Sequence, residues 1–228
     1  MEKFTLGIAV LVFVILAGCS QKEYHPTKES ISKIEASVES LEKSAAEILS
    51  DLANQEFSIH AGQISEDDFA FMEAFGKAFI NLYTGAVAEQ ETVSFKNYIA
   101  NKNLRQFTNT MLELEQLQDS KGGNGIIFGL DNEFKKAELK RLDNNLYYLE
   151  LPFSNQGSGM SCKLLIQSVN KSLTIADVYF GNKDGVGTMT TGHPAVRKLD
   201  NPKLWDDREW VDGVMEKLEK YETELLSM

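Results

Sequence analysis

The sequence LYYLELPF, residues 146–153, places an apolar side chain at every second position, as expected for a β-strand with one buried face. The same strand-like character is found in three other runs, residues 134–142, 161–169 and 173–180. The links DNN (residues 143–145) and NKS (residues 170–172) consist of residues that favour tight turns. Because such short links join antiparallel neighbours, the pattern predicts a four-stranded antiparallel sheet, with Pro152 at a strand end or in an edge strand.

Upstream of residue 125, the apolar residues follow the 3.6-residue period of helices instead. Ser65, with Asp68 three residues later, is typical of a capping box at the start of a helix. The helix that follows carries a wide apolar face, formed by Phe69, Met72, Phe75, Phe79, Leu82 and Tyr83. Residues 95–117 indicate one broken helix or two short ones, and Trp205 opens a C-terminal helix. Helices, then an antiparallel sheet, then a final helix predict an α+β domain over residues 65–228.

A separate helix is predicted for residues 28–57 by a heptad pattern. Its apolar seam is formed by Ile31, Ile34, Val38, Leu41, Ala45, Ile48 and Leu52. One interpretation is a coiled coil that joins two copies of the chain, and the other is an amphipathic helix packed against its own domain. The positions that flank the seam offer no pairs of opposite charge, because they hold Glu35, Ser37, Glu42 and Ser44. We therefore expect a monomer rather than a dimer.

The first residues have the parts of a secretory signal. Lys3 supplies a positive charge, residues 4–17 form an apolar run, and Ala17 and Gly18 are the small residues expected before a cleavage site. This run is shorter than the roughly 20 apolar residues that a membrane-spanning helix needs. We therefore predict a signal peptide, residues 1–18, that is removed after export.

The four residues Leu16-Ala17-Gly18-Cys19 resemble the lipobox of bacterial lipoproteins. The resemblance implies that the Cys19 sulfur is joined to a diacylglyceryl group, with fatty acyl chains such as palmitate, before cleavage. Two acyl chains hold a protein stably on a membrane, whereas one does so only marginally. The protein is thus expected to be lipid-anchored on the extracytoplasmic face of the cell membrane, or on the outer membrane in a Gram-negative host. Residues 19–27 would then form a tether.

Charge and motifs exclude several function classes. The net charge of −11 repels nucleic acid, and no block of basic residues offsets it. Residues 187–192 have the glycine spacing of a phosphate-binding loop, but His193 and Pro194 stand where lysine and serine or threonine are needed. The three histidines are too far apart in sequence for a metal-binding motif. We expect no cofactor, no metal and a mobile loop at residues 185–194.

The order of the elements resembles that of the cone-shaped nuclear-transport-factor-two-like and ketosteroid-isomerase-like proteins, over about residues 65–190. The resemblance implies a curved sheet around a cavity. Candidate cavity residues are Asp177, Tyr179, Tyr148, Glu150, Phe75 and Phe79. Strict alternation along residues 173–180 puts Asp177 on the same face as Leu173 and Ile175. An acid in an apolar cavity would have a raised pKa and could act as a general acid or base.

Three hypotheses about function follow. The first is a non-enzymatic lipoprotein, held in the membrane by lipid on Cys19, whose domain binds an unidentified protein or small ligand. The second is a structural or assembly protein that acts through the heptad helix. The third is an enzyme that uses Asp177 in its cavity. The acidic composition and the incomplete catalytic motifs favour the first hypothesis.

Overall fold

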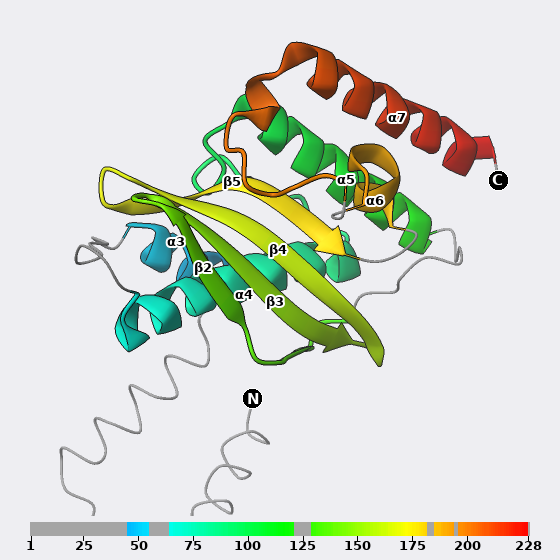
Figure 1. The fold of residues 1–228 in the computed structure, drawn as a ribbon. Coiled ribbons are helices and arrows are strands. Elements are labelled where there is room, and N and C mark those ends of the chain that lie inside the picture. The colour runs from blue at the N-terminus through cyan, green and yellow to red at the C-terminus, as the bar shows by residue number, and fades with distance from the viewer. Residues whose placement is uncertain (1–44, 55–63, 121–128, 182–184, 194–195, 228) are drawn as a thin grey trace, which may run out of the picture. The chain divides into compact units, whose positions relative to one another are not determined.

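The computed structural model (Figure 1) describes residues 45–54, 64–120, 129–181, 185–193 and 196–227. Its elements, in chain order, are α3 (Ala45–Asn54), α4 (Glu66–Glu89), α5 (Lys102–Ser120), β1 (Asn132–Phe134), β2 (Glu138–Asp143), β3 (Leu146–Asn155), β4 (Ser158–Val169), β5 (Ser172–Gly181), α6 (Val186–Thr191), a 3₁₀ turn (Leu204–Asp206) and α7 (Arg208–Ser227). This order confirms the predicted α+β class. The predicted signal peptide and tether lie outside the described residues. Within the described ranges, no helix is both long and apolar enough to cross a membrane.

Helix α4 starts at the predicted capping box. The Ser65 hydroxyl accepts the Asp68 N–H at 3.1 Å, and Asp68 Oδ2 accepts the Ser65 N–H at 3.0 Å. These reciprocal bonds satisfy N–H groups that have no partner within the helix. The helix continues past Gly85 to Glu89, and Gln90 then ends it in a left-handed conformation with φ of 57°.

A single helix, α5, occupies most of the region predicted as one broken helix or two short ones. The chain first makes a turn at residues 96–98, and the Asn101 side chain then accepts two backbone N–H groups at the start of α5, at 2.9 and 3.1 Å. The carbonyl of Tyr98, in the preceding turn, accepts the Ile175 N–H at 2.8 Å. The turn therefore covers part of the outer edge of β5, which would otherwise expose unpaired backbone groups.

Within the described residues, the antiparallel sheet has five strands rather than the predicted four. The run 134–142, predicted as one strand, is divided, because β1 pairs with residues 153–155 of β3 and β2 pairs with residues 146–150. Pro152 lies between these two pairings, where its missing N–H is tolerated, and its carbonyl accepts the Lys135 N–H at 2.8 Å. The prediction that Pro152 marks a strand end or an edge strand is wrong, since it lies inside the central strand β3.

One face of the sheet packs against α4 (Figure 1). The approach is close at Gly76, where an added Cβ atom would lie 2.5 Å from Leu151 Cδ1 and 2.6 Å from Leu149 Cδ2. Phe180 of β5 points into the same core, and its ring stacks on Tyr83 with 4.5 Å between the ring centres. A glycine at position 76 therefore lets the aromatic face of α4 reach the sheet.

Helix α3 is the described part of the predicted heptad helix. It packs on α4 and β5, with Leu49 and Ala53 buried and the seam residues Ile48 and Leu52 partly buried. The described residues all belong to one compact unit, residues 44–228. The end of the heptad pattern thus packs within its own chain. The rest of that pattern, upstream of α3, lies outside the described residues, so the monomeric state stays a prediction.

The last helices lie on the β5 side of the sheet (Figure 1). Helices α5 and α7 pack together, and α6 packs on β5 and α7. Residues 196–203, which lead into the 3₁₀ turn, pass over β5, where Arg197 contacts Asp177. The C-terminal helix begins at Arg208, slightly later than predicted, because Trp205 belongs to the 3₁₀ turn.

Candidate functional site

A β-bulge in β5 decides which way Asp177 points. Two adjacent residues of β4 lie opposite Asp177 and Ile175, so Ala176 is an extra residue in β5. A bulge interrupts the two-residue alternation of a strand. Ile175 therefore faces the α4 core, whereas Asp177 faces the opposite side of the sheet. The prediction that Asp177 shares a face with Leu173 and Ile175 is wrong for this reason.

The six candidate cavity residues separate into two groups. Phe75 and Phe79 of α4 are fully buried in the core between α4 and the sheet. Cross-strand partners share a face of a sheet, and the register of β3, β4 and β5 places four residues on the opposite face, namely Tyr148, Glu150, Asp177 and Tyr179. The structure therefore does not bring the six residues together around one cavity.

Glu150 is the centre of a polar network on that outer face. Its carboxylate accepts the Tyr148 and Ser161 hydroxyls, each at 3.0 Å, and Lys163 Nζ lies 3.3 Å away. Burial acts to raise the pKa of Glu150, but these donors and the Lys163 charge outweigh it, so the pKa is lowered. Burial and the bond to Glu150 raise the pKa of Tyr148. Glu150 is therefore held ionised, and a carboxylate stabilised in this way is a weak base.

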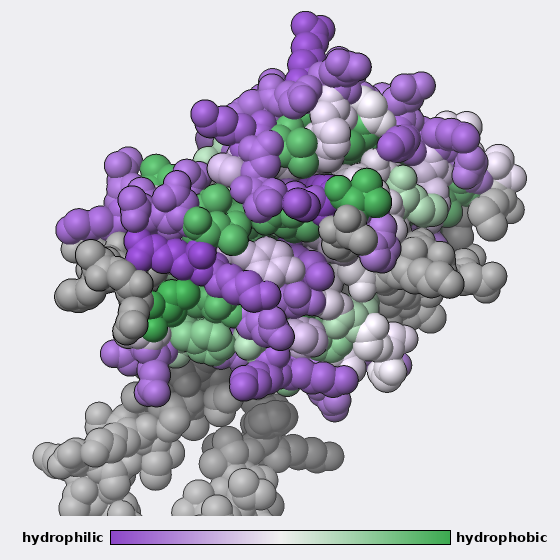
Figure 2. Space-filling model, viewed as in Figure 1, coloured by the Kyte–Doolittle hydropathy of each residue, from purple (hydrophilic) through white to green (hydrophobic). Residues whose placement is uncertain are grey.

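Tyr179 links the same face to α6. Its hydroxyl lies 2.7 Å from Thr188 Oγ1, and either oxygen can donate. Figure 2 shows this side of the molecule, where hydrophilic residues predominate and hydrophobic ones form several separate areas. Tyr148 and Glu150 thus belong to a partly exposed polar surface rather than to an apolar cavity.

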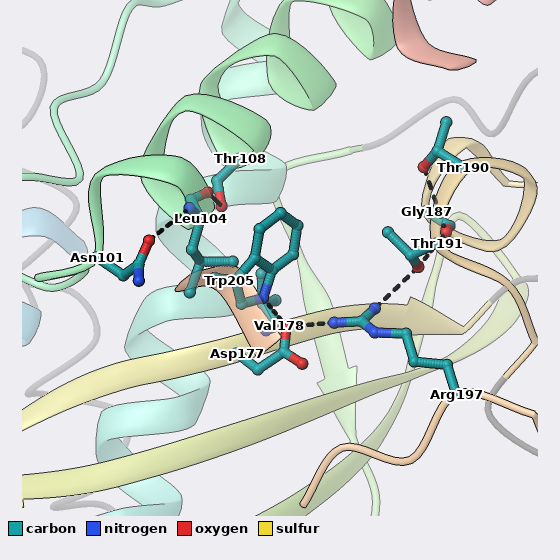
Figure 3. Close-up of polar contacts among 10 residues, drawn as sticks. All are labelled: Asn101, Leu104, Thr108, Asp177, Val178, Gly187, Thr190, Thr191, Arg197 and Trp205. Atoms are coloured by element: carbon teal, nitrogen blue, oxygen red, sulfur yellow. Dashed lines mark hydrogen bonds and ion pairs between the residues drawn. The ribbon is translucent and has the colours of Figure 1, made fainter. Parts of the chain in front are cut away.

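Asp177 lies in a buried polar cluster with Arg197 and Trp205 (Figure 3). Its Oδ1 atom accepts hydrogen bonds from Arg197 Nη2, from Trp205 Nε1 at 2.7 Å and from the Val178 N–H at 2.8 Å. Arg197 Nη1 donates to Thr191 Oγ1 at 2.8 Å. The cluster therefore ties β5 to α6 and to the segment that leads into α7.

The charges of Asp177 and Arg197 balance within this cluster. Burial raises the pKa of Asp177, while the Arg197 guanidinium and the Trp205 N–H oppose that shift. The guanidinium carbon also lies 5.8 Å from the ring centre of Trp205 and 5.5 Å from that of Trp210, within the range of cation–π attraction. In the part of the chain that the structure describes, Asp177 Oδ2 and Arg197 Nε have no hydrogen-bond partner. Asp177 is 0% exposed and already accepts three hydrogen bonds. We therefore interpret it as a residue that positions Arg197 and Trp205.

A groove of about 360 Å³ lies between α6 and α7, next to the buried cluster. It is lined by Thr190, Thr191, Asp207, Glu209, Trp210, Gly213, Val214 and Lys217. Two of these residues, Thr191 and Trp210, also contact Arg197. The Lys217 ammonium donates to the Thr190 carbonyl at 3.3 Å. The groove thus combines an aromatic side chain, a small apolar area and charged groups of both signs.

The groove was not predictable from the glycine- and threonine-rich stretch that forms one of its walls. This stretch, expected as a mobile loop, contains the helix α6. The hydroxyls of Thr190 and Thr191 bond to the carbonyls of Val186 and Gly187, at 2.7 and 2.6 Å, and both threonines are buried. Threonine side chains form such bonds to the carbonyl four residues earlier within helices. The prediction of a loop is therefore corrected over the residues of α6.

Arg197 and Trp205 were also absent from the predicted set. They lie 20 and 28 residues after Asp177, and neither belongs to a spacing that a motif would reveal. Their partnership depends on the path of the chain after β5, so no sequence signal pointed to it.

Metal and thiol chemistry receive no support from the described residues. Among them, no group of three or more His, Cys, Asp or Glu side chains could hold a metal ion. Cys162 is buried in the core, and burial raises the pKa of its thiol well above the ordinary value. Cys162 is thus a protonated thiol at neutral pH and a poor nucleophile.

No family model, curated protein or solved structure matches this chain. The resemblance to bacterial lipoproteins therefore stays a prediction from residues 16–19. The resemblance to the cone-shaped proteins stays a prediction from the order of helices and strands.

Proposed function

We propose that this chain is a lipoprotein, anchored through Cys19 on the extracytoplasmic face of a membrane, whose α+β domain binds a ligand or partner without catalysing a reaction. The observation that carries the anchor is the lipobox-like sequence at residues 16–19, at the end of an apolar run too short to span a bilayer. A thiol at the last of these four positions is the group that a thioether-linked lipid requires. An assembly role through residues 28–57 stays a second prediction.

The binding role is supported by the hydrogen bonds and burial of Glu150 and Asp177, the two acids that a catalytic hypothesis would use. Glu150 accepts two hydroxyl donors and lies beside Lys163, which lowers its pKa. Asp177 is buried and already accepts three hydrogen bonds. Asp177 is too deeply buried to reach the proton of a bound substrate, and Glu150, whose pKa is lowered, is a weak base.

The groove between α6 and α7 is better suited to binding. Its volume of about 360 Å³ lies within the roughly 300–1,000 Å³ that small-molecule sites occupy. Its lining combines Trp210 and Val214 with hydroxyl and charged groups, a mixture that gives both contact area and orientation. We therefore place the binding activity of the domain at this groove.

The anchor is tested by metabolic labelling of the full-length chain with a fatty acid in a bacterium that processes lipoproteins. Wild type is expected to incorporate the label and to lose residues 1–18. Cys19→Ser should accumulate as uncleaved precursor without label. Cys162→Ala is the matched control, because it removes the other cysteine and should leave labelling unchanged. Label on Cys19→Ser, or none on wild type, would contradict the proposal.

A further inference from the structure

The groove between α6 and α7 already holds one ammonium group. Lys217 Nζ lies in it and donates to the Thr190 carbonyl at 3.3 Å. The exposed carboxylates of Asp207 and Glu209 line the same groove. Two negative charges and one positive charge leave the lining net negative, and the chain as a whole carries a charge of −11. Such a field raises the local concentration of cations.

The Trp210 ring forms an aromatic side of the groove, and contacts with Trp205 and Arg197 fix its orientation. The Trp205 ring meets it edge-on, at 84° and with 4.7 Å between the ring centres, and the Arg197 guanidinium lies 5.5 Å from its centre. Because Asp177 is ion-paired with Arg197, the guanidinium adds little positive potential to the groove. The part of the Trp210 ring that lines the groove can therefore attract a cation, as aromatic faces do.

An anion has less to bind in this groove. The helix start of α7 is already occupied, because Asp207 Oδ1 accepts the Trp210 N–H at 3.2 Å. The hydroxyl of Thr191 accepts from Arg197 and donates to the Gly187 carbonyl at 2.6 Å. Among the described residues that line the groove, Lys217 is thus the one cationic side chain, and two carboxylates oppose it.

From these contacts we propose that the α6–α7 groove binds a small aliphatic ligand with primary ammonium groups, such as a diamine. The inference rests on the proposed ligand-binding function and names its ligand class. One ammonium takes the position of Lys217 Nζ on the Thr190 carbonyl and faces Asp207 and Glu209. The methylene chain lies on Trp210 and Val214, which excludes water from the apolar part of the ligand. Lys217 competes for the same carbonyl and so limits the affinity.

The test is titration of the full-length chain, in detergent, with 1,4-diaminobutane, followed by calorimetry and by tryptophan fluorescence. Both tryptophans of the chain, Trp205 and Trp210, lie at or behind the groove, so their emission reports its occupancy. We expect saturable binding that weakens as salt is raised, since exposed charges are screened. Succinate, of the same length and opposite charge, should produce no saturable signal.

Three variants locate the site. Glu209→Gln should weaken diamine binding about fivefold, the effect of one exposed charge. Lys217→Met should strengthen it about threefold or more, because it removes the competing ammonium and one repulsive charge. Glu219→Gln is the matched control, since it makes the same change of charge on an exposed position of α7 outside the groove, and it should leave binding unchanged.

Absence of saturable diamine binding to wild type would overturn the inference. Equal weakening of binding by Glu209→Gln and Glu219→Gln would also overturn it, because it would indicate a diffuse cloud of cations around the acidic surface rather than a site. Saturable binding of succinate would assign the opposite ligand class. These outcomes are distinguishable from failure of the anchor. If the wild-type chain incorporates the fatty-acid label but does not bind the diamine, the lipoprotein proposal stands and only the proposed ligand class is rejected.

Discussion

Glu115 is expected to make the stability of the domain depend on pH. Its carboxylate, on α5, accepts the hydroxyl of Tyr83 from α4 at 2.9 Å. Burial raises the pKa of Glu115 from 4.5 to about 7, and the hydrogen bond from Tyr83 opposes this only in part. Helix α7 packs on α5, and burial followed by the Glu115 charge raises the pKa of Tyr221 on α7. Glu115 thus titrates at a place where three helices meet.

The sign of the effect follows from the direction of this shift. A carboxyl whose pKa is raised by folding binds its proton more tightly in the folded state than in the unfolded chain. Its contribution to stability is complete below about pH 4.5 and is lost as the pH rises through about 7. The difference between 4.5 and about 7, at about 1.36 kcal/mol for each pH unit, sets an upper limit of about 3.4 kcal/mol. Because Glu115 is partly exposed, we expect about 1–3 kcal/mol.

Glu115→Gln isolates the contribution, since an amide keeps the shape and the acceptor but does not titrate in this range. Urea unfolding of wild type and variant at pH 4.5, 6 and 8 gives the free energy of unfolding of each. The variant should gain about 1–3 kcal/mol relative to wild type between pH 4.5 and pH 8. Glu113→Gln, at an exposed position of the same helix, is the control and should show no such change. A difference between Glu115→Gln and wild type that stays constant with pH would refute the reasoning.

Two further predictions concern the packing of the sheet. Asp177→Asn and Arg197→Met should each cost about 3–5 kcal/mol, because each leaves a buried group without its partner, and the double variant should cost less than their sum. Urea unfolding measures all three, and strictly additive losses would contradict a coupled pair. Gly76→Ala should destabilise the fold by about 1–3 kcal/mol, since its Cβ would meet Leu151 at 2.5 Å. Gly85→Ala lies in the same helix, and its Cβ would meet no atom within 4 Å beyond the neighbouring backbone of that helix. It should instead be neutral or stabilising by up to about 1 kcal/mol, and equal unfolding midpoints for the two variants would refute this.

Features that depend on residues a few positions apart could be predicted from the sequence. The capping box of Ser65 and Asp68 forms as expected, because its hydrogen bonds join residues three positions apart. The NKS link turns as expected, with Asn170 and Lys171 at φ of 50° and 63°, the left-handed conformations that two-residue hairpin turns require. The α+β class follows from the change in apolar period from helix to strand, which is also a local property. The lipobox-like residues 16–19 are read from the sequence alone.

The candidate site was decided by tertiary structure. Alternation along β5 predicts one face for Asp177, but a single extra residue, Ala176, moves it to the other face, and a bulge leaves no mark in the apolar pattern. Its partners Arg197 and Trp205 are brought to it by the path of the chain after β5. The groove between α6 and α7 exists only because the chain folds back after α6 so that these two helices pack together. Short-range sequence patterns show which face of a helix or strand is apolar, whereas these contacts depend on how whole helices and strands pack in the tertiary structure.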